Sequence, residues 1–398
     1  MDKKWVKIPD VLFFQEGPGV RNTQYTNEGV KLLNVANLVD GKVDLSTSDR
    51  YISEEEAFGK YSHFLCNDGD FIVASSGIKV EYIDKKMGFV DETMLPLCMN
   101  TSTIRFKVLN PNELRIRYFM YYLKSQHFKG QLFRLITGSA QLNYGPSHLK
   151  QMDMPLIKVS EQDKIVRNLD ILQKIIDLRQ NELNKFDELI KARFVELFGS
   201  ISNNKFGYEV MTLQDVCEPI KDGTHQTPTY TEDTVNGYKF LSSKDVTSGK
   251  VDWNHLKYIP EELHKELYKR ISPRKGDILL AKNGTTGVAA IVDRDDVFDI
   301  YVSLALLRPL GMVTSEYLCS AVNSIETKHQ FDSSLKGIGV PNLHLGEIKK
   351  TKIVVPPIEA QEQFADFVKQ VDKSKFEVQK SLEETQLLFD SLMQEYFG

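Results

Sequence analysis

The sequence predicts an α+β protein built as a tandem duplicated unit: two mixed, β-rich domains separated by two long antiparallel coiled-coil helices with pseudo-twofold symmetry. The first observation is that residues 138–199 align without a gap on residues 337–398, so that both halves end in Phe-Gly. This offset of 199 residues is far longer than the roughly 20–50 residues of solenoid repeats, and it indicates a duplicated domain.

The front parts of the two halves agree more loosely. Gly-Lys-Val-Asp at 41–44 recurs at 249–252, and a Gly-Asp pair followed by an apolar run at 69–74 recurs at 276–281. Similar ends with divergent fronts predict a shared framework that carries two different recognition surfaces.

Four segments follow along the chain, at 1–155, 156–199, 200–355 and 356–398. The first and third contain short β-type runs separated by Gly, Asn and Asp turns, with one helix expected around 114–124. Within the second and fourth, apolar residues recur at three- and four-residue steps without Pro or Gly, which predicts one long helix in each.

The apolar seams of these helices contain charged residues at Arg179, Arg193 and Lys375. A mixed seam disfavours pairing of each helix with its own copy, so we expect the two helices to pair with each other, antiparallel. The alternative is that each helix packs separately on its own domain.

The composition is that of a soluble globular protein, with 41% hydrophobic and 26% charged residues. No apolar run approaches 20 residues and no signal peptide opens the chain, so we expect no membrane segment and a cytoplasmic location. The four cysteines, Cys66, Cys98, Cys217 and Cys319, have no metal or redox spacing and are expected to be reduced. The formal charge of −5 is an average and neither favours nor excludes nucleic acid.

Catalytic signatures are absent from the sequence, including phosphate-loop, zinc-protease, serine-hydrolase and adenine-methyltransferase motifs. Asp277 and Lys282 weakly resemble a nuclease pair, but Ala281 stands where a metal-binding carboxylate is needed. We therefore expect no catalytic residue, metal or cofactor in this chain. The alternative is an enzyme, either a nuclease or a methyltransferase, with a new motif.

Polar loops occur at three equivalent places in each half, and their residue types suit base edges and phosphates. In the first half the candidate DNA-binding residues are Arg21, Asn22, Gln24, Tyr25, Ser75, Ser76, Lys79, Ser139, Gln141, Asn143 and Tyr144. In the second half they are Lys221, His225, Gln226, Thr227, Lys282, Asn283, Thr285, Thr286, Lys336 and Asn342. For any single residue, an ordinary solvated turn is the alternative.

Taken together, the chain resembles the specificity subunit of type I restriction–modification systems over nearly its whole length. The motifs that carry the resemblance are residues 16–21, 222–228, 275–281 and 355–363, in this order. The resemblance implies target recognition domains at 1–155 and 200–355, each followed by a spacer helix at 156–199 or 356–398. The two spacers differ from each other at two places where the helices start. The first has Ile157-Lys158 where the second has Pro356-Pro357, and Ala360 replaces the acidic residue that matches Glu161.

The resemblance also implies the function and the partners. Such a subunit binds double-stranded DNA at a bipartite target and positions two adenine methyltransferase (modification) subunits and the restriction subunits. S-adenosylmethionine, ATP and Mg are then expected in the partner subunits. The alternative is a non-catalytic coiled-coil scaffold for protein interactions.

Overall fold

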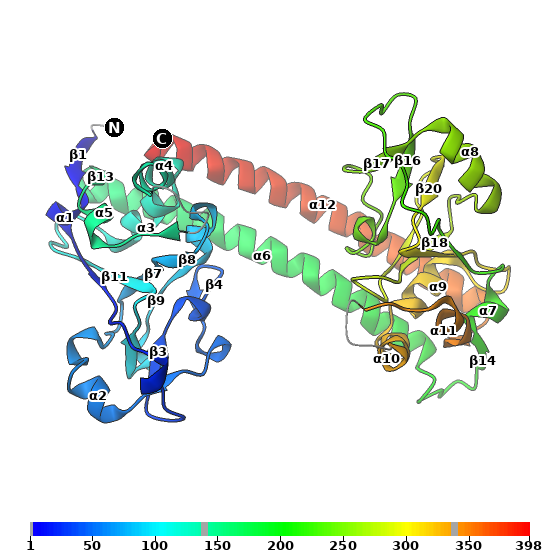
Figure 1. Cartoon of the computed structure of the whole chain (residues 1–398), viewed down its shortest axis with the longest axis horizontal. Helices are drawn as coiled ribbons and strands as arrows, with labels where there is room; N and C mark the ends of the chain where they lie inside the picture. The colour runs from blue at the N-terminus through cyan, green and yellow to red at the C-terminus, as the bar shows by residue number, and fades with distance from the viewer. Residues whose placement is uncertain (1–2, 137–141, 336–340) are drawn as a thin grey trace. The chain divides into compact units, whose positions relative to one another are not determined.

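The computed structural model describes residues 3–136, 142–335 and 341–398. The chain forms two compact units, one of residues 1–178 with 381–398 and one of residues 179–380 (Figure 1). The first unit is therefore discontinuous in sequence, whereas the second is a single stretch.

The first unit contains two main sheets and three short strand pairs. The antiparallel four-stranded sheet has the order β2 (Leu12–Glu16), β11 (Thr103–Val108), β7 (Phe71–Ala74), β9 (Met87–Phe89). The three-stranded sheet has the order β10 (Leu97–Met99), β3 (Val30–Leu33), β6 (Tyr51–Ile52), with β10 parallel to β3. The pairs are β1 (Lys4–Lys7) with β13 (Asp153–Leu156), β4 (Leu38–Val39) with β5 (Lys42–Val43), and β8 (Ser76–Ile78) with β12 (Leu142–Asn143).

The second unit repeats this topology. Its four-stranded sheet has the order β15 (Lys221–Asp222), β21 (Leu304–Leu307), β18 (Ile278–Ala281), β19 (Ala289–Ile291). Its three-stranded sheet has the order β17 (Lys257–Ile259), β16 (Tyr238–Leu241), β20 (Phe298–Ile300), and here too one pair, β16 with β20, is parallel. β14 (Glu209–Thr212) pairs with β22 (Lys352–Val355). The duplication therefore extends through the front parts, where the sequences diverge.

The shorter helices also correspond between the units. In the first unit they are α1 (Ile8–Val11), α2 (Glu54–Phe58), α3 (Ile116–Lys124), α4 (Gln126–Leu135) and α5 (Pro146–Leu149). In the second unit they are α7 (Leu213–Val216), α8 (Glu261–Arg270), α9 (Ser315–Val322), α10 (Ile325–Ser334) and α11 (Leu345–Lys350). The expected helix around 114–124 is α3.

The two long helices are α6 (Val159–Phe198) and α12 (Ile358–Phe397), each of 40 residues. They follow directly on β13 and β22, which end at Leu156 and Val355. Both helices start at equivalent residues, so Pro356-Pro357 in place of Ile157-Lys158 does not shift the start of the helix.

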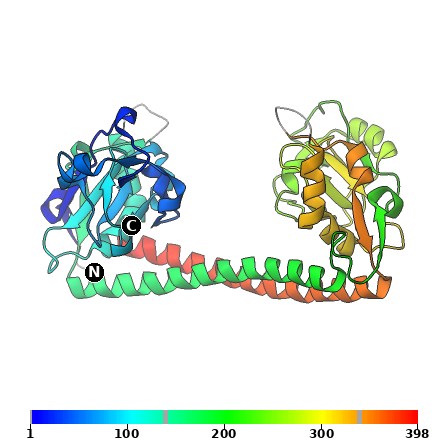
Figure 2. The same ribbon diagram turned by 90° about the horizontal axis from the view of Figure 1, so that it is seen from below.

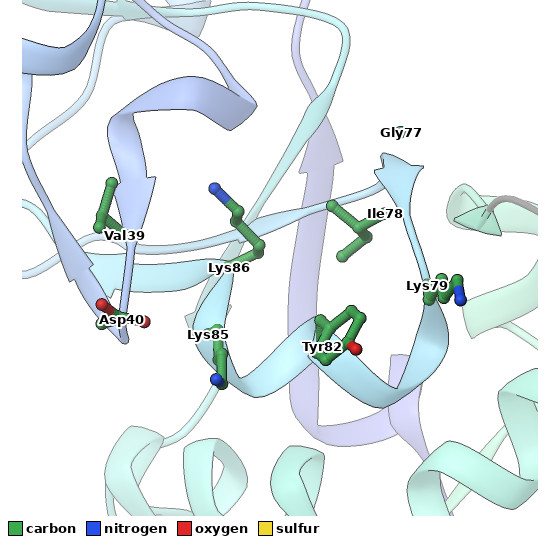
Figure 3. Close-up of a pocket in the computed structure, with 8 residues that line it drawn as sticks. All are labelled: Val39, Asp40, Gly77, Ile78, Lys79, Tyr82, Lys85 and Lys86. Carbon is green, nitrogen blue, oxygen red and sulfur yellow. The ribbon is translucent and has the colours of Figure 1, made fainter. Parts of the chain in front are cut away.

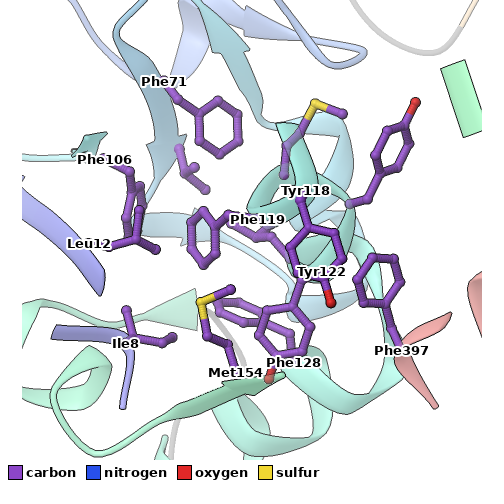
Figure 4. Packing of buried hydrophobic residues seen from close by; sticks show 14 of the residues in the cluster. Ile8, Leu12, Phe71, Phe106, Tyr118, Phe119, Tyr122, Phe128, Met154 and Phe397 are labelled. Atoms are coloured by element: carbon purple, nitrogen blue, oxygen red, sulfur yellow. The ribbon is translucent and has the colours of Figure 1, made fainter. Parts of the chain in front are cut away.

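The core of the first unit contains parts of both long helices. The aromatic rings of Phe71, Phe106 and Phe119 lie between the sheet and α3, with the Phe106 and Phe119 centroids 5.0 Å apart. The start of α6 and the end of α12 pack on the same cluster, and Phe397 lies beside Tyr118 and Tyr122 at centroid distances of 5.2 and 6.0 Å (Figure 4).

In the second unit the same positions are filled by the opposite ends of the two helices. Phe194 and Phe198, at the end of α6, pack against Phe364, near the start of α12, with centroid distances of 5.6 and 5.5 Å. Tyr317 of α9 completes this aromatic cluster, 4.9 Å from Phe198.

The long helices therefore pair antiparallel within each unit, as Figures 1 and 2 also show. Two of the charged seam residues have partners on the facing helix: Lys375 forms an ion pair with Asp187, and the Arg193 guanidinium lies 5.9 Å from the Phe367 ring centroid. The third, Arg179, pairs with Glu182 of its own helix at 3.0 Å. The predicted fold class and antiparallel pairing are confirmed, and the alternative of separately packed helices is wrong.

A buried glutamine joins each long helix to its domain with the same three hydrogen bonds. The Gln162 amide accepts from the Arg115 N–H at 2.8 Å and donates to the carbonyls of Glu113 and Ile157, both at 2.8 Å. Gln361 accepts from the Thr314 N–H at 2.9 Å and donates to the carbonyls of Met312 and Pro356, at 3.0 and 2.8 Å. Sequence alignment matches these two residues, and the structure shows that they form the same junction.

Candidate nucleic-acid interface

In the first unit two of the three predicted loops lie against each other. Strand β8 pairs antiparallel with β12, which places Asn143 opposite Ser76. The next residue continues the contact, because the Tyr144 N–H donates to the Ser75 carbonyl at 3.0 Å. Ser76 is partly exposed and Asn143 and Lys79 are exposed, so these candidates share one accessible edge.

The second unit joins the equivalent loops in the same way. Asn283 and Asn342 form an isolated antiparallel bridge, and the Leu343 N–H donates to the Lys282 carbonyl at 2.7 Å. Thr285 is exposed beside this bridge, and Thr286 is partly exposed. Both Asn side chains have a buried Oδ1 without a hydrogen-bond partner among the described residues. Ser139, Gln141 and Lys336 lie outside the described residues.

The strand that leads into each of these loops is held by a buried aspartate. Asp70 forms ion pairs with Arg105 and Lys107 at 3.1 and 3.0 Å. In the second unit Asp277 pairs with Arg308 at 2.7 Å. The carboxylates also accept equivalent backbone N–H groups, from Asn67 and Arg274, both at 2.9 Å. Asp277 thus has a structural role, and it does not pair with Lys282.

Lys282 belongs instead to a cluster centred on Asp222. Its side chain is only 7% exposed, and its Nζ lies 3.3 Å from Asp222 Oδ2. The same carboxylate contacts Arg270 at 3.3 Å and His225 at 3.2 Å. Through Lys282 this cluster connects the opening loop of the second unit to the loop after β18. The Lys221 ammonium joins the same opening loop to the end of α8, because it donates to the Arg270 carbonyl at 3.2 Å. Gln226 and Thr227 remain exposed.

Sequence reasoning missed Asp222, although one signal for it existed. Asp222-Gly223 corresponds to Glu16-Gly17 in the first unit, and both glycines lie very close to a neighbouring backbone. An added Cβ would lie 2.2 Å from the Asn100 carbonyl oxygen at Gly17, and 2.0 Å from the Ile300 carbonyl oxygen at Gly223. The acidic residue before each glycine is therefore fixed at the same place in the fold.

Glu16 has surroundings unlike those of Asp222. Among the described residues it has no cationic partner, because Ser75 takes the place of Lys282. Partial burial raises the pKa of the Glu16 carboxyl. The carboxylate lies close to Gly145, where a Cβ would be 3.4 Å from Oε2. The adjacent Tyr144 hydroxyl is buried and also has no partner among the described residues.

In the first unit, Gln24 and Tyr25 of the opening loop contact residues between 50 and 61 of the same unit. Gln24 donates to Glu56 and to the Tyr61 hydroxyl, at 2.6 and 3.1 Å. The Arg50 guanidinium lies 5.3 Å from the Tyr25 ring centroid. Arg21 and Asn22 are exposed. Gln24 and Tyr25 thus serve internal contacts, while Arg21 and Asn22 are free to meet a ligand.

The described residues contain no cluster of three or more His, Cys, Asp or Glu side chains arranged to bind a metal ion. None of the helices in the described part of the chain combines the length and apolar character needed to cross a bilayer.

Comparison with known proteins agrees with the duplicated architecture. Residues 3–187 and 206–386 each match the model of the type I restriction modification DNA specificity domain. The chain belongs to this family. Each match covers one front domain together with most of the long helix that follows it, so the specificity domain is the unit that is duplicated.

Curated relatives of the chain are specificity subunits. The subunit of the MjaVIII enzyme of Methanocaldococcus jannaschii is 23% identical over 194 residues, which cover 48% of this chain and 44% of the relative. The subunit of the EcoBI enzyme of Escherichia coli is 24% identical over 272 residues, which cover 61% of this chain and 57% of the relative. The chain thus spans about half the length of the curated relatives it matches.

Two solved structures share the fold across nearly the full chain. The S subunit of a type I restriction–modification system from M. genitalium superposes with a TM-score of 0.55 at 16% identity, covering 100% of this chain and 96% of that one. A chain from a study of complex assembly and conformational transition of the type I R-M system gives 0.54 at 16% identity, covering 99% and 97%. At these identities the likeness shows the fold of the specificity domain family alone.

Proposed function

We propose that this chain reads a bipartite DNA target, with the domain at 1–155 on one half-site and the domain at 200–355 on the other. One observation carries the proposal: the two units place equivalent loops on the same framework, yet the side chains on those loops differ. Shared framework contacts explain why the loops are held alike. The different side chains then give each domain its own base sequence.

The exposed loop residues have the chemistry of base and phosphate readers. Arg21, Asn22 and Asn143 in the first unit can contact guanine or adenine edges, whereas the second unit presents Gln226, Thr227 and Thr285. Lys79 and the serines and threonines suit phosphate oxygens, which position a protein without reading sequence. Because the exposed loop residues of the two units differ, we expect the two half-sites to differ in base sequence.

The long helices act in this proposal as spacers and as the surface for partners. At about 1.5 Å per residue, each 40-residue helix spans roughly 60 Å. Leu189 and Leu388, at equivalent positions, are 46% and 51% exposed, and Phe376 and Leu387 are 67% and 70% exposed. Exposed apolar side chains mark protein interaction surfaces. The equivalent pair Leu189 and Leu388, one in each unit, suits two copies of a methyltransferase subunit.

The chain itself is proposed to be non-catalytic and cytoplasmic. S-adenosylmethionine, ATP and Mg then belong to the methyltransferase and restriction subunits. A methyltransferase must take the target adenine out of the duplex, and the two domains would hold the DNA on either side while it does so.

Modified-base sequencing of DNA from cells that co-express this chain with the methyltransferase subunit of its system tests the proposal. We expect a split motif with one methylated adenine in each half. A continuous motif, or no motif, contradicts the two-reader proposal and favours the coiled-coil scaffold. In that case binding of the assembled complex to DNA would lack the steep salt dependence of phosphate contacts.

Lengthening both long helices tests the spacer role. Seven residues inserted after Leu178 and seven before Ser381, at the boundaries of the two units, keep the heptad seam in register. They add about 10 Å at 1.5 Å per residue, or about three base pairs at 3.4 Å each. We expect the same two half-sites with a gap wider by about that amount. A seven-residue insertion at the exposed loop residue Val235 is the control and should leave the gap unchanged.

A further inference from the structure

The first unit contains an insertion that the second lacks. Equivalent hydrogen bonds close the connection after the Gly-Asp strand in each unit: the Ala74 N–H donates to the Lys86 carbonyl and the Ala281 N–H to the Val288 carbonyl, both at 2.8 Å. Between these anchors lie residues 75–85 in the first unit and 282–287 in the second, eleven against six. The additional residues form most of a 3₁₀ turn at Val80–Lys85.

This insertion forms one wall of a pocket of about 620 Å³. The pocket is lined by Val39, Asp40, Gly77, Ile78, Lys79, Tyr82, Lys85 and Lys86 (Figure 3). The side chain of Ile78 lies next to the Tyr82 ring, and Lys79 and Lys85 stand to either side of that ring. The opposite wall is the hairpin of β4 and β5.

The lining is positively charged and its charge is not neutralised internally. It holds three lysines and one aspartate, and none of the three lysines is within ion-pair distance of a carboxylate in the described part of the chain. The nearby Asp84 is occupied by Lys129 at 3.0 Å. A net excess of positive charge beside an apolar wall favours an anionic ligand.

Tyr82 adds a second element of recognition. Its side chain is 50% exposed, and the Lys85 Nζ lies 5.9 Å from its ring centroid. An accessible aromatic face next to lysines is the chemistry by which proteins stack a base and bind the adjoining phosphate. Of Lys79, Tyr82, Lys85 and Lys86, only Lys79 is predicted from the sequence to contact DNA.

We propose that this pocket binds a nucleotide unit, with the lysines on the phosphate and Tyr82 against the base or sugar. This inference rests on the proposed function, because it takes the nucleotide from a strand of the bound DNA. The pocket is lined by Gly77 and Ile78 of β8, the strand that begins with Ser76 and pairs with β12, which contains Asn143. A DNA strand that contacts those residues therefore passes the mouth of the pocket, and only the first half-site gains this extra contact.

The test measures DNA affinity of the chain assembled with its methyltransferase subunits, by fluorescence anisotropy at several salt concentrations. The variant K79Q/K85Q/K86Q should bind its target about tenfold or more weakly, and should lower the slope of log affinity against log salt by about 2 to 3, since each phosphate contact contributes about 0.9. Tyr82→Ala should weaken binding without changing the slope, and Tyr82→Phe should restore it.

The matched control is K4Q/K60Q/K158Q, which removes the same charge from three exposed lysines that do not line the pocket. It should bind DNA as the unchanged chain does. Calorimetric titration with ATP and AMP separates the two sources of a nucleotide. If the triple pocket variant loses binding of a free nucleotide but keeps DNA affinity, the site serves a soluble nucleotide.

If the pocket variant matches the control towards both DNA and free nucleotides, the inference is overturned. That result is distinct from failure of the proposed function. Were the proposed function wrong, the unchanged complex would itself show no split motif, whereas failure of the pocket alone leaves specific DNA binding intact in every variant.

Discussion

The two units differ in what they bury between the short front helix, α2 or α8, and the three-stranded sheet. In the first unit Ala57 of α2 and Cys98 of β10 belong to one apolar cluster. At the equivalent positions the second unit has His264 of α8 and Asp299 of β20, joined by a 2.7 Å hydrogen bond and covered by the stacked ring of Tyr238. The same backbone arrangement therefore accepts either an apolar or an ionisable pair.

A second difference lies at the loops themselves. In the second unit Asp222 is surrounded by Lys282, Arg270 and His225, which tie two predicted recognition loops together. In the first unit Glu16 has no such cation among the described residues, and Ser75 lies where Lys282 would be. The loops of the second unit are thus held by ion pairs, while the first unit leaves a partly buried carboxylate without a cation among the described residues.

The largest effect is expected from breaking the Asp222 cluster. Lys282→Met should lower the free energy of unfolding of the second unit by about 3 kcal/mol, because Lys282 is the buried cation beside the buried Asp222 carboxylate, whereas Arg270 and His225 are largely exposed to solvent. The double variant D222N/K282M should recover most of that loss. Urea denaturation followed by Trp253 fluorescence reports on this unit, since the chain has two tryptophans and Trp5→Phe removes the other.

The matched control is Ser75→Ala at the equivalent position of the first unit. Among the described residues, the Ser75 hydroxyl donates one 3.4 Å hydrogen bond, to the Thr101 carbonyl, so its loss should cost about 1 kcal/mol or less. Equal losses at Lys282 and Ser75 would show that the charge cluster contributes nothing beyond packing.

The glutamine junctions should respond alike, which sharpens the contrast with the loops. Gln162→Leu and Gln361→Leu each remove three hydrogen bonds of a buried side chain and leave backbone groups unpaired, at an expected cost of about 2–3 kcal/mol in either unit. Denaturation monitored by Trp5 for the first variant and Trp253 for the second measures both. A difference of more than about 1 kcal/mol between them would mean that the two frameworks are not energetically equivalent.

The last expected effect, similar in size to that of the glutamines, is a pH dependence that arises from the buried Asp299 of the second unit. Burial raises the pKa of the Asp299 carboxyl from 3.8 to about 6, although its bond to His264 opposes the shift. The folded chain then binds the proton more tightly than the unfolded chain. The contribution of Asp299 to stability is therefore greatest below about pH 4 and falls by about 2–3 kcal/mol as the pH rises to about 6.

Comparing the unchanged chain with Asp299→Asn between pH 4 and 7 by urea denaturation checks this sign. As the pH rises, the free energy of unfolding of the unchanged chain should fall relative to that of Asp299→Asn. Cys98 provides the internal comparison, because burial raises the pKa of its thiol to about 12 and it stays neutral throughout. A difference between the unchanged chain and Asp299→Asn that stays constant from pH 4 to 7 would contradict the assignment to Asp299.

Much of the architecture was predictable because it depends on local spacing and on the repeat. The apolar steps of α6 and α12 and the matched Gln162 and Gln361 are visible in the sequence. The Asp222 cluster was not, because Arg270 and Lys282 lie far along the chain and no local pattern links them to Asp222. The His264–Asp299 pair could not be predicted for the same reason. Tyr82 could not be predicted because its turn has no counterpart in the second half. The assignment of individual residues to DNA contacts stays a prediction.

The division of the chain also sets an order of events during synthesis. All residues of the second unit lie within 179–380, whereas the first unit needs Phe389, Met393 and Phe397 to fill its core. A nascent chain that has left the ribosome up to residue 380 therefore holds everything the second domain requires, while the first still exposes an unfilled apolar surface. The domain that is translated first is completed last.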